Sequence, residues 1–160
     1  MKRISMEKDS NRNFKVLAWI AIAVPAFFLL AAGDLALRSR SALHRAEREE
    51  AWRDDPAAKA AYFEGRDSME TAADKAAAAA PPSPESAARA ADLRKAGKEF
   101  RISESSAKMA YIWYKTAAGD FYFPMNPWAA RARVKLPAAL AAWRAELAAK
   151  GVKAEEWMLE

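Results

Sequence analysis

Residues 16–33 read VLAWIAIAVPAFFLLAAG, and none of these eighteen positions carries a charge. No other stretch of the chain is comparably apolar. At about 1.5 Å of rise per residue the run forms a helix of roughly 27 Å, close to the ~30 Å hydrocarbon core of a bilayer. Residues 35–37 extend the run slightly. The sequence therefore predicts a single transmembrane helix over residues 16–37.

A buried core helix and a cleaved signal peptide are the alternatives to a membrane anchor. A buried helix that is apolar on every face needs a large surrounding core, which a chain of 160 residues with so many charges does not supply. A signal peptide fits the basic residues ahead of the run and the small residues Ala31, Ala32 and Gly33 near its end. The run exceeds the usual apolar region of about 7–15 residues, which favours the uncleaved anchor. A processed, secreted helical protein stays open as an alternative.

The tail before the span, residues 1–15, contains five basic and two acidic residues and supplies +3 of the chain's net charge of +5. Four arginines follow the span within fifteen positions of Gly33. By the positive-inside rule, this narrow excess predicts a cytoplasmic N-terminus and a periplasmic C-terminal domain. The abundance of Ala and Arg is typical of a GC-rich bacterial genome. We therefore expect a protein of the bacterial inner membrane.

Small side chains lie along one side of the predicted span. Ala18, Ala21 and Pro25 are spaced at i, i+3 and i+7, so a second membrane helix could approach closely there. The alternative is that Ala is simply common in this segment and the strip faces lipid. The lack of a Gly-xxx-Gly pattern favours that alternative.

Residues 38–80 are rich in Ala, Arg and Glu and predict a charged helical stalk. Asp55 and Pro56 suit the N-cap and first position of a helix within it. Residues 81–98 predict a Pro-rich joint and a short helix that begins at Ser83 and Pro84 and ends near Gly97. No heptad pattern runs through this region, so a partner could cover its large apolar side chains, which are Leu43, Trp52, Tyr62, Phe63 and Met69.

Residues 99–160 contain ten of the seventeen aromatic residues and predict a small folded domain. Residues 109–116 (MAYIWYKT) have strand propensity, residues 117–120 can turn, and residues 121–123 can return as a second strand. Asn126 and Pro127 predict a short helix, and Pro137 opens an amphipathic helix. The predicted fold is mainly α: one N-terminal transmembrane helix, a charged Ala-rich helical stalk, and a small C-terminal α+β domain with one β-hairpin.

The sequence offers little catalytic chemistry. Its five scattered glycines form no phosphate-binding loop, and the lack of cysteine excludes disulfides and thiolate metal sites. The single histidine, His44, lies in a charged stretch without neighbouring metal ligands. Adjacent carboxylates such as Glu49 and Glu50 point about 100° apart on a helix. We therefore predict a protein that is not an enzyme and that binds no metal and no cofactor.

The C-terminal part of the chain has an excess of basic residues. Residues 107–153 contain eight basic and two acidic residues, interleaved with aromatic residues. Such a segment can meet an anionic polymer, an anionic lipid or an acidic protein surface. The alternative, which we favour, is that the aromatic residues form the core and the bases are solvated. The candidate partner or ligand surface comprises Trp113, Tyr114, Tyr122, Trp128, Arg131, Arg133 and Lys135.

Two functions follow as hypotheses. The first is a single-pass membrane protein without enzymatic activity that serves as an accessory or scaffold subunit of a larger bacterial envelope complex. The second is a membrane-anchored binding module whose basic, aromatic C-terminal domain recognises an anionic ligand such as cell-wall polymer, lipid or nucleic acid. The expected partners are the bilayer and other proteins of the membrane complex. Nucleic acid is the least favoured ligand, because most of the excess positive charge lies beside the span.

Overall fold

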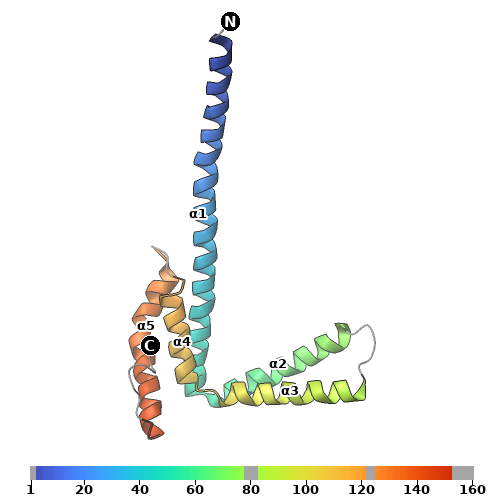
Figure 1. The fold of residues 1–160 in the computed structure, drawn as a ribbon. Helices are drawn as coiled ribbons and strands as arrows, with labels where there is room; N and C mark the ends of the chain where they lie inside the picture. Colours follow the sequence, from blue (N-terminus) through green and yellow to red (C-terminus); the bar gives the residue numbers. More distant parts are fainter. Residues whose placement is uncertain (1–2, 78–82, 122–124, 153–160) are drawn as a thin grey trace.

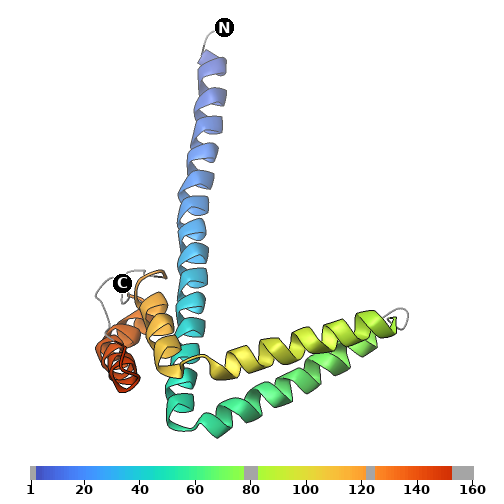
Figure 2. The ribbon, with the colours of Figure 1, turned by 60° about the horizontal axis from the view of Figure 1, so that its bottom comes forward.

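Five α-helices make up the part of the chain that the computed structural model describes, residues 3–77, 83–121 and 125–152 (Figure 1). Three of them form a bundle, and the other two form an arm that projects from one end of the bundle (Figures 1 and 2). In chain order the helices are α1 (Arg3–Asp54), α2 (Pro56–Ala77), α3 (Pro84–Ser103), α4 (Ser106–Ala118) and α5 (Pro127–Ala149).

Helix α1 continues without a break from the predicted span into the predicted stalk. Within the described residues it is the one helix long and apolar enough to cross a membrane. Its side chains from Leu17 to Leu30 are exposed, including large ones such as Trp19 and Phe28. No other described helix lies beside this part of α1 (Figures 1 and 2). The predicted apolar helix is therefore present, and it projects beyond the bundle.

The C-terminal part of α1 packs against α4 and α5. Helix α4 runs antiparallel to α1, since Ala117 lies beside Ser39 and the preceding turn of α4 lies beside Glu50. Alanines at the helix contacts let the backbones approach closely, while fully buried Leu43 and Tyr114 fill the remaining volume. The buried alanines of the core cluster are Ala42, Ala46, Ala107, Ala110, Ala117, Ala118, Ala132 and Ala139.

The predicted β-hairpin, and with it the α+β domain, is wrong. Residues 109–116 lie inside α4, and the described part of the chain contains no strand. Helix α4 begins where Ser105 accepts a hydrogen bond from the Lys108 backbone N–H. Its buried positions follow the helical repeat of three and four, which outweighs the strand propensity of its aromatic residues. Of the predicted second strand, Phe121 lies in a turn, and residues 122 and 123 lie outside the described residues.

Three predicted helix starts are confirmed, but the end predicted near Gly97 and the helix start predicted at Pro137 are wrong. Asp55 Oδ1 accepts a 3.1 Å hydrogen bond from the Ala58 N–H, and Ser83 and Asn126 cap α3 and α5 in the same way. Helix α3 continues through Gly97 to Ser103. Helix α5 is one helix through Pro137, because Pro removes one hydrogen bond without ending a helix that packing supports on both sides.

Helices α2 and α3 lie antiparallel, since Lys98 pairs with Glu64 and Arg94 pairs with Asp74. Within α3, all of whose residues are described, no residue is buried. The arm therefore has almost no apolar core of its own, and exposed ion pairs provide much of the contact between its two helices.

Candidate binding groove

An open groove lies where the bundle meets the arm. Its walls come from α1, α2 and α4, and the end of α3 contributes Arg101. It holds about 640 Å³, within the range of roughly 300–1,000 Å³ for small-ligand sites. Arginine and aromatic residues predominate in its lining: Arg45, Arg48, Arg66, Arg101, Trp52, Tyr62, Phe63 and Trp113.

Helical spacing explains why these side chains meet. On α1, Arg45, Arg48, Glu49 and Trp52 follow the i, i+3, i+4, i+7 pattern of one helix face. The face that carries Leu43 packs into the bundle instead. One side of the same helix segment therefore forms the bundle core, and another forms the wall of the groove.

The aromatic residues of α2 close one end of this wall. The Tyr62 and Phe63 rings lie 5.0 and 5.5 Å from the Trp52 ring, measured between centroids. The sequence left room for a partner to cover these three side chains. The chain itself covers Trp52, which is 6% exposed. It leaves Met69, farther along α2, 74% exposed.

Two arginines of the groove lie over aromatic rings. The Arg45 guanidinium carbon is 4.7 Å from the centroid of the Trp113 ring. The Arg48 guanidinium carbon is 5.1 Å from Trp52 and 5.0 Å from Tyr62. Such stacking holds a planar guanidinium while its in-plane N–H groups stay available to an anion.

Within the part of the chain that the structure describes, most of these positive charges have no ion-pair partner. Among the described residues, no ion pair within 4.0 Å involves Arg45, Arg48 or Arg101, and all three side chains are exposed. Arg66 differs, because its Nε lies 2.6 Å from a carboxylate oxygen of Glu70. The groove therefore offers exposed, unpaired guanidinium groups backed by aromatic surface.

One carboxylate lies in the wall of the groove. Burial raises the pKa of Glu49 above its usual value, although a hydrogen bond to Ser106 and the charge of Lys59 oppose this effect. Its Oε2 is buried without a hydrogen bond among the described atoms and lies 3.9 Å from the Lys59 Nζ. The buried Lys59 also donates a 2.6 Å hydrogen bond to the Glu104 carbonyl, so it ties α2 to the start of the α3–α4 connection.

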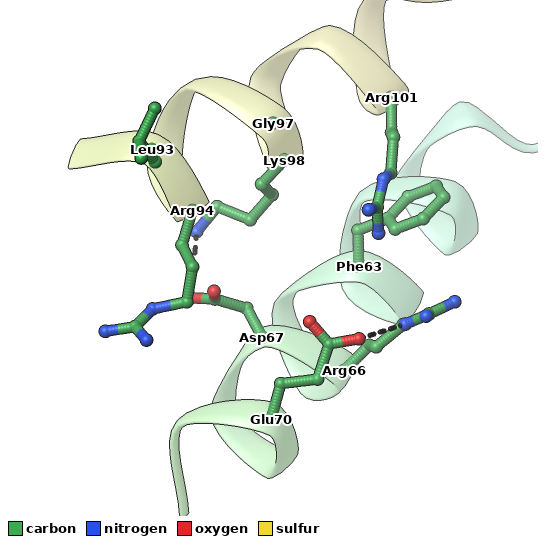
Figure 3. A pocket seen from close by; sticks show the side chains of 9 residues that line it. All are labelled: Phe63, Arg66, Asp67, Glu70, Leu93, Arg94, Gly97, Lys98 and Arg101. Atoms are coloured by element: carbon green, nitrogen blue, oxygen red, sulfur yellow. Dashed lines mark hydrogen bonds and ion pairs between the residues drawn. The ribbon is translucent and has the colours of Figure 1, made fainter. Parts of the chain in front are cut away.

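A second hollow lies on the arm between α2 and α3 (Figure 3). Its charged groups are largely paired with each other. Arg66 binds Glu70 there, and Lys98 lies 2.9 Å from Glu64 and 3.8 Å from Asp67. The exposed acids and bases neutralise each other, so this hollow has less attraction for an ion than the groove at the bundle.

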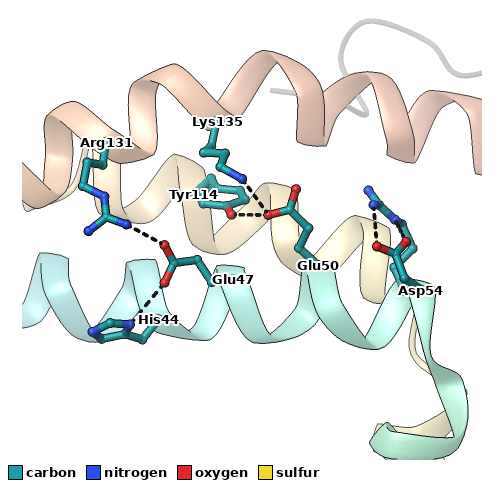
Figure 4. A network of polar contacts seen from close by, with 8 residues as sticks. His44, Glu47, Glu50, Asp54, Tyr114, Arg131 and Lys135 are labelled. Atoms are coloured by element: carbon teal, nitrogen blue, oxygen red, sulfur yellow. Dashed lines mark hydrogen bonds and ion pairs between the residues drawn. The ribbon is translucent and has the colours of Figure 1, made fainter.

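A polar network joins α1 to α4 and α5 on another side of the bundle (Figure 4). Arg131 lies 3.3 Å from Glu47, and Lys135 lies 3.3 Å from Glu50. The Tyr114 hydroxyl donates to the same Glu50 oxygen as Lys135. These contacts hold the bundle together.

The structure divides the predicted ligand surface between several places. Trp113 lies in the groove with Arg45, and Tyr114 is fully buried in the bundle core. Trp128, in the first turn of α5, lies beside Arg40 and His44 and does not line the groove. Arg131 and Lys135 pair with Glu47 and Glu50. Arg133 donates a hydrogen bond to the Ala118 carbonyl. Tyr122 lies outside the described residues.

The predicted contact strip in the span, Ala18, Ala21 and Pro25, is exposed on α1, and no described helix packs against it. No group of three possible metal ligands occurs in the searched, described part of the chain.

The groove's own arginines were not predicted from the sequence, where they look like residues of a solvated stalk. The signal for them was the presence of Trp52, Tyr62 and Phe63 in otherwise small and charged helices. Large aromatic side chains in such helices need a surface to pack on, and here they pack on one another beside the arginines.

Comparison of the chain with models of protein families, with curated proteins and with solved structures gives no match.

Proposed function

We propose that this protein is a single-pass membrane protein without enzymatic activity that serves as an accessory or scaffold subunit of a larger bacterial envelope complex. Its apolar α1 segment anchors it in the inner membrane, the bundle stands beside the membrane, and the arm binds a protein partner. Exposed leucine and phenylalanine side chains over residues 17–30 support the anchor, because lipid is the solvent in which they are stable.

The exposed arm is the observation that carries the proposal. Helix α3 buries none of its residues, yet it bears Leu93 and Phe100, which are 69% and 66% exposed. These two residues are seven positions apart and so lie on one side of the helix. Apolar side chains repeated along one side of a protruding helix are typical of a surface that docks into a partner.

The proposed orientation has a cytoplasmic N-terminus and a periplasmic bundle and arm. Its support is the excess of five basic residues before the span over four within fifteen positions after it. A reporter active in only one compartment, fused after Glu160, tests this orientation. Reporter activity in the periplasm supports the proposed orientation, and reporter activity in the cytoplasm shows the opposite orientation.

Purification in a mild detergent tests the scaffold role. The unaltered chain should carry a stoichiometric partner, and Leu93→Glu with Phe100→Glu should release it. Val134→Glu is the control, because Val134 is also a strongly exposed apolar residue but lies on α5, away from the arm. Loss of the partner from both variants, or a monodisperse chain without any companion, contradicts the proposal.

A second function is favoured by the groove: recognition of an anionic ligand. The supporting observation is the pair Arg45 and Arg48, which are exposed, stacked on rings and without carboxylate partners among the described residues. Inorganic polyphosphate is a suitable probe for the full chain. Binding should weaken as salt rises, and Arg45→Gln with Arg48→Gln should weaken it more than the exposed control Arg144→Gln. Equal effects of the variants would eliminate the groove as the binding site.

A further inference from the structure

One long-range hydrogen bond shows which part of α1 lies beside the end of α4. The buried Ser39 hydroxyl donates to the Ala117 carbonyl oxygen, 3.0 Å away, near the end of α4. Ser39 follows Gly33, the last residue of the uncharged run, by six positions, or about 9 Å of helix. The headgroup layer on each side of a bilayer is roughly 5–8 Å thick. For a membrane span that ends between Gly33 and Leu37, the end of α4 lies at the level of the headgroup layer.

The start of α5 lies at the same level. The Arg40 guanidinium carbon lies over the Trp128 ring, 5.3 Å from its centroid. Figures 1 and 2 show both helix ends at the end of the bundle nearer the N-terminal part of α1. The bundle end that contains residues 117–121 and 125–128 consequently faces the side from which α1 projects.

A hydrogen bond joins the two described segments of this end of the bundle. The buried Asn126 side chain donates a 3.2 Å hydrogen bond to the Phe121 carbonyl and caps α5. Phe121 packs against the bundle core. Met125, by contrast, is 91% exposed and has a φ of 69°, which is uncommon for a residue other than glycine. The fold therefore presents a large apolar side chain outward at this end.

The surrounding residues match a membrane interface. Trp128 is half-buried, with an amphipathic ring of the kind enriched at headgroup level. Arg40 and Lys115 are exposed, and no carboxylate pairs with either among the described residues. Two acids are also near, Asp34, which pairs with Arg38 at 2.7 Å, and the exposed Asp120.

Given the membrane anchor proposed above, on which this inference depends, we propose that the α4–α5 end of the bundle rests on the phospholipid headgroups of the bilayer that α1 crosses. Met125 and Trp128 enter the interface, and Arg40 and Lys115 bind lipid phosphates. The contact fixes the height of the bundle above the membrane. Asp55, which precedes the first residue of the arm, follows Asp34 by 21 positions. The arm therefore begins roughly 30 Å from Asp34 along the axis of α1. The partner is thereby held at a set distance from the bilayer.

The natural absence of cysteine makes a depth measurement direct. The full chain is placed in vesicles of phosphatidylcholine and phosphatidylglycerol with one fluorescent label at Met125→Cys, Ala145→Cys or Val24→Cys. Residue 145 lies near the distal end of α5, and residue 24 lies in the middle of the span. Lipids with a nitroxide on the headgroup should quench the label at residue 125 several-fold more than the label at residue 145. Lipids with a nitroxide deep in the acyl chain should quench the label at residue 24.

The outcomes separate this inference from the anchor itself. Quenching at residue 24 with equally weak headgroup quenching at residues 125 and 145 overturns the inference and leaves the anchor intact. No quenching at residue 24 overturns both. A further comparison uses a label at Asp120→Cys: Met125→Asp should reduce its headgroup quenching, and Val134→Asp on exposed α5 surface should not. Equal effects of the two substitutions would also overturn the inference.

Discussion

The hydroxyl group of Tyr114 donates a 2.7 Å hydrogen bond to Oε2 of Glu50, and the Tyr114 side chain is fully buried. The same oxygen accepts a 3.3 Å hydrogen bond from Lys135, so one carboxylate joins α1, α4 and α5 (Figure 4). Burial raises the pKa of Tyr114 well above its usual value, and the Glu50 carboxylate raises it further. The hydroxyl therefore stays protonated and remains a donor at neutral pH.

Removal of this hydroxyl should weaken the bundle. We expect Tyr114→Phe to lower the free energy of unfolding by about 1–2 kcal/mol, because a buried hydrogen bond to a charged acceptor is lost. Tyr62→Phe is the matched control, since the Tyr62 side chain is 38% exposed and its hydroxyl lies 3.5 Å from Arg48. Chemical denaturation of the detergent-solubilised chain measures both. Equal effects of the two substitutions would show that the contact with Glu50 contributes nothing specific.

Close packing of alanines should make the bundle sensitive to added volume. Ala46 has no exposed surface and lies in the bundle core, whereas Ala51 is exposed on the same helix. Ala46→Leu should cost about 1–3 kcal/mol through overpacking, and Ala51→Leu should cost little. Thermal unfolding followed by circular dichroism gives the comparison. A neutral Ala46→Leu would mean that α1 does not pack closely against α4 and α5.

Glu49 should make stability depend on pH. Its pKa is raised in the folded state by burial, so the folded protein binds this proton more tightly than the unfolded chain. Stability should then fall as pH rises from the ordinary value, 4.5, through the raised one. Glu49→Gln should exceed the unaltered chain in stability at neutral pH, and the difference should vanish below the ordinary pKa.

The carboxylate of Glu70 should have the opposite effect on the pH dependence of stability, which Glu70→Gln tests. Arg66 lowers the pKa of Glu70, so this carboxylate stabilises the fold above its ordinary pKa, and the contribution disappears as pH falls through the lowered value. The effect should be small because both side chains are exposed. Denaturation curves across pH measure both variants. If Glu49→Gln is less stable than the unaltered chain at neutral pH, the attraction between Glu49 and Lys59 outweighs the free-energy cost of burying the Glu49 carboxylate.

The arm should open far more readily than the bundle. No residue of α3 is buried, and its ion pairs with α2 are exposed, as for Lys98 with Glu64. Amides of α3 should therefore exchange hydrogen much faster than those of α4, and added salt should increase the difference. Mass spectrometry of exchanged peptides measures the rates. Similar protection of α3 and α4 would indicate that the arm is stable without a partner.

The sequence predicted the helix starts well, because a helix cap depends on neighbouring residues in the chain. Asp55, Ser83 and Asn126 each precede a proline at a helix start, and each caps its helix as expected. The predicted strand over residues 109–116 was wrong because the prediction relied on composition, and Tyr111, Ile112 and Trp113 are residues that favour strands. The buried residues of α4 are instead Tyr111, Tyr114 and four alanines at helical spacing, and alanine gives almost no hydrophobic signal. Packing against α1 decided the outcome.

The groove was harder to predict for a related reason. Arg45 and Arg48 looked like solvated stalk residues, because the sequence did not show that Trp113, more than sixty positions later, lies under Arg45. The helix start at Pro56 was predicted, but the direction in which α2 leaves α1, which brings Tyr62 back to Trp52, was not. A site built from three helices depends on tertiary packing, which local patterns do not specify.

Carbonate extraction of membranes that contain the protein, followed by intact-mass measurement of the retained chain, tests the central claim most directly. We predict that the chain stays in the membrane fraction and that its mass includes residues 16–33. Release of the chain into the carbonate wash, or a retained chain that begins beyond Gly33, would contradict the proposed anchor.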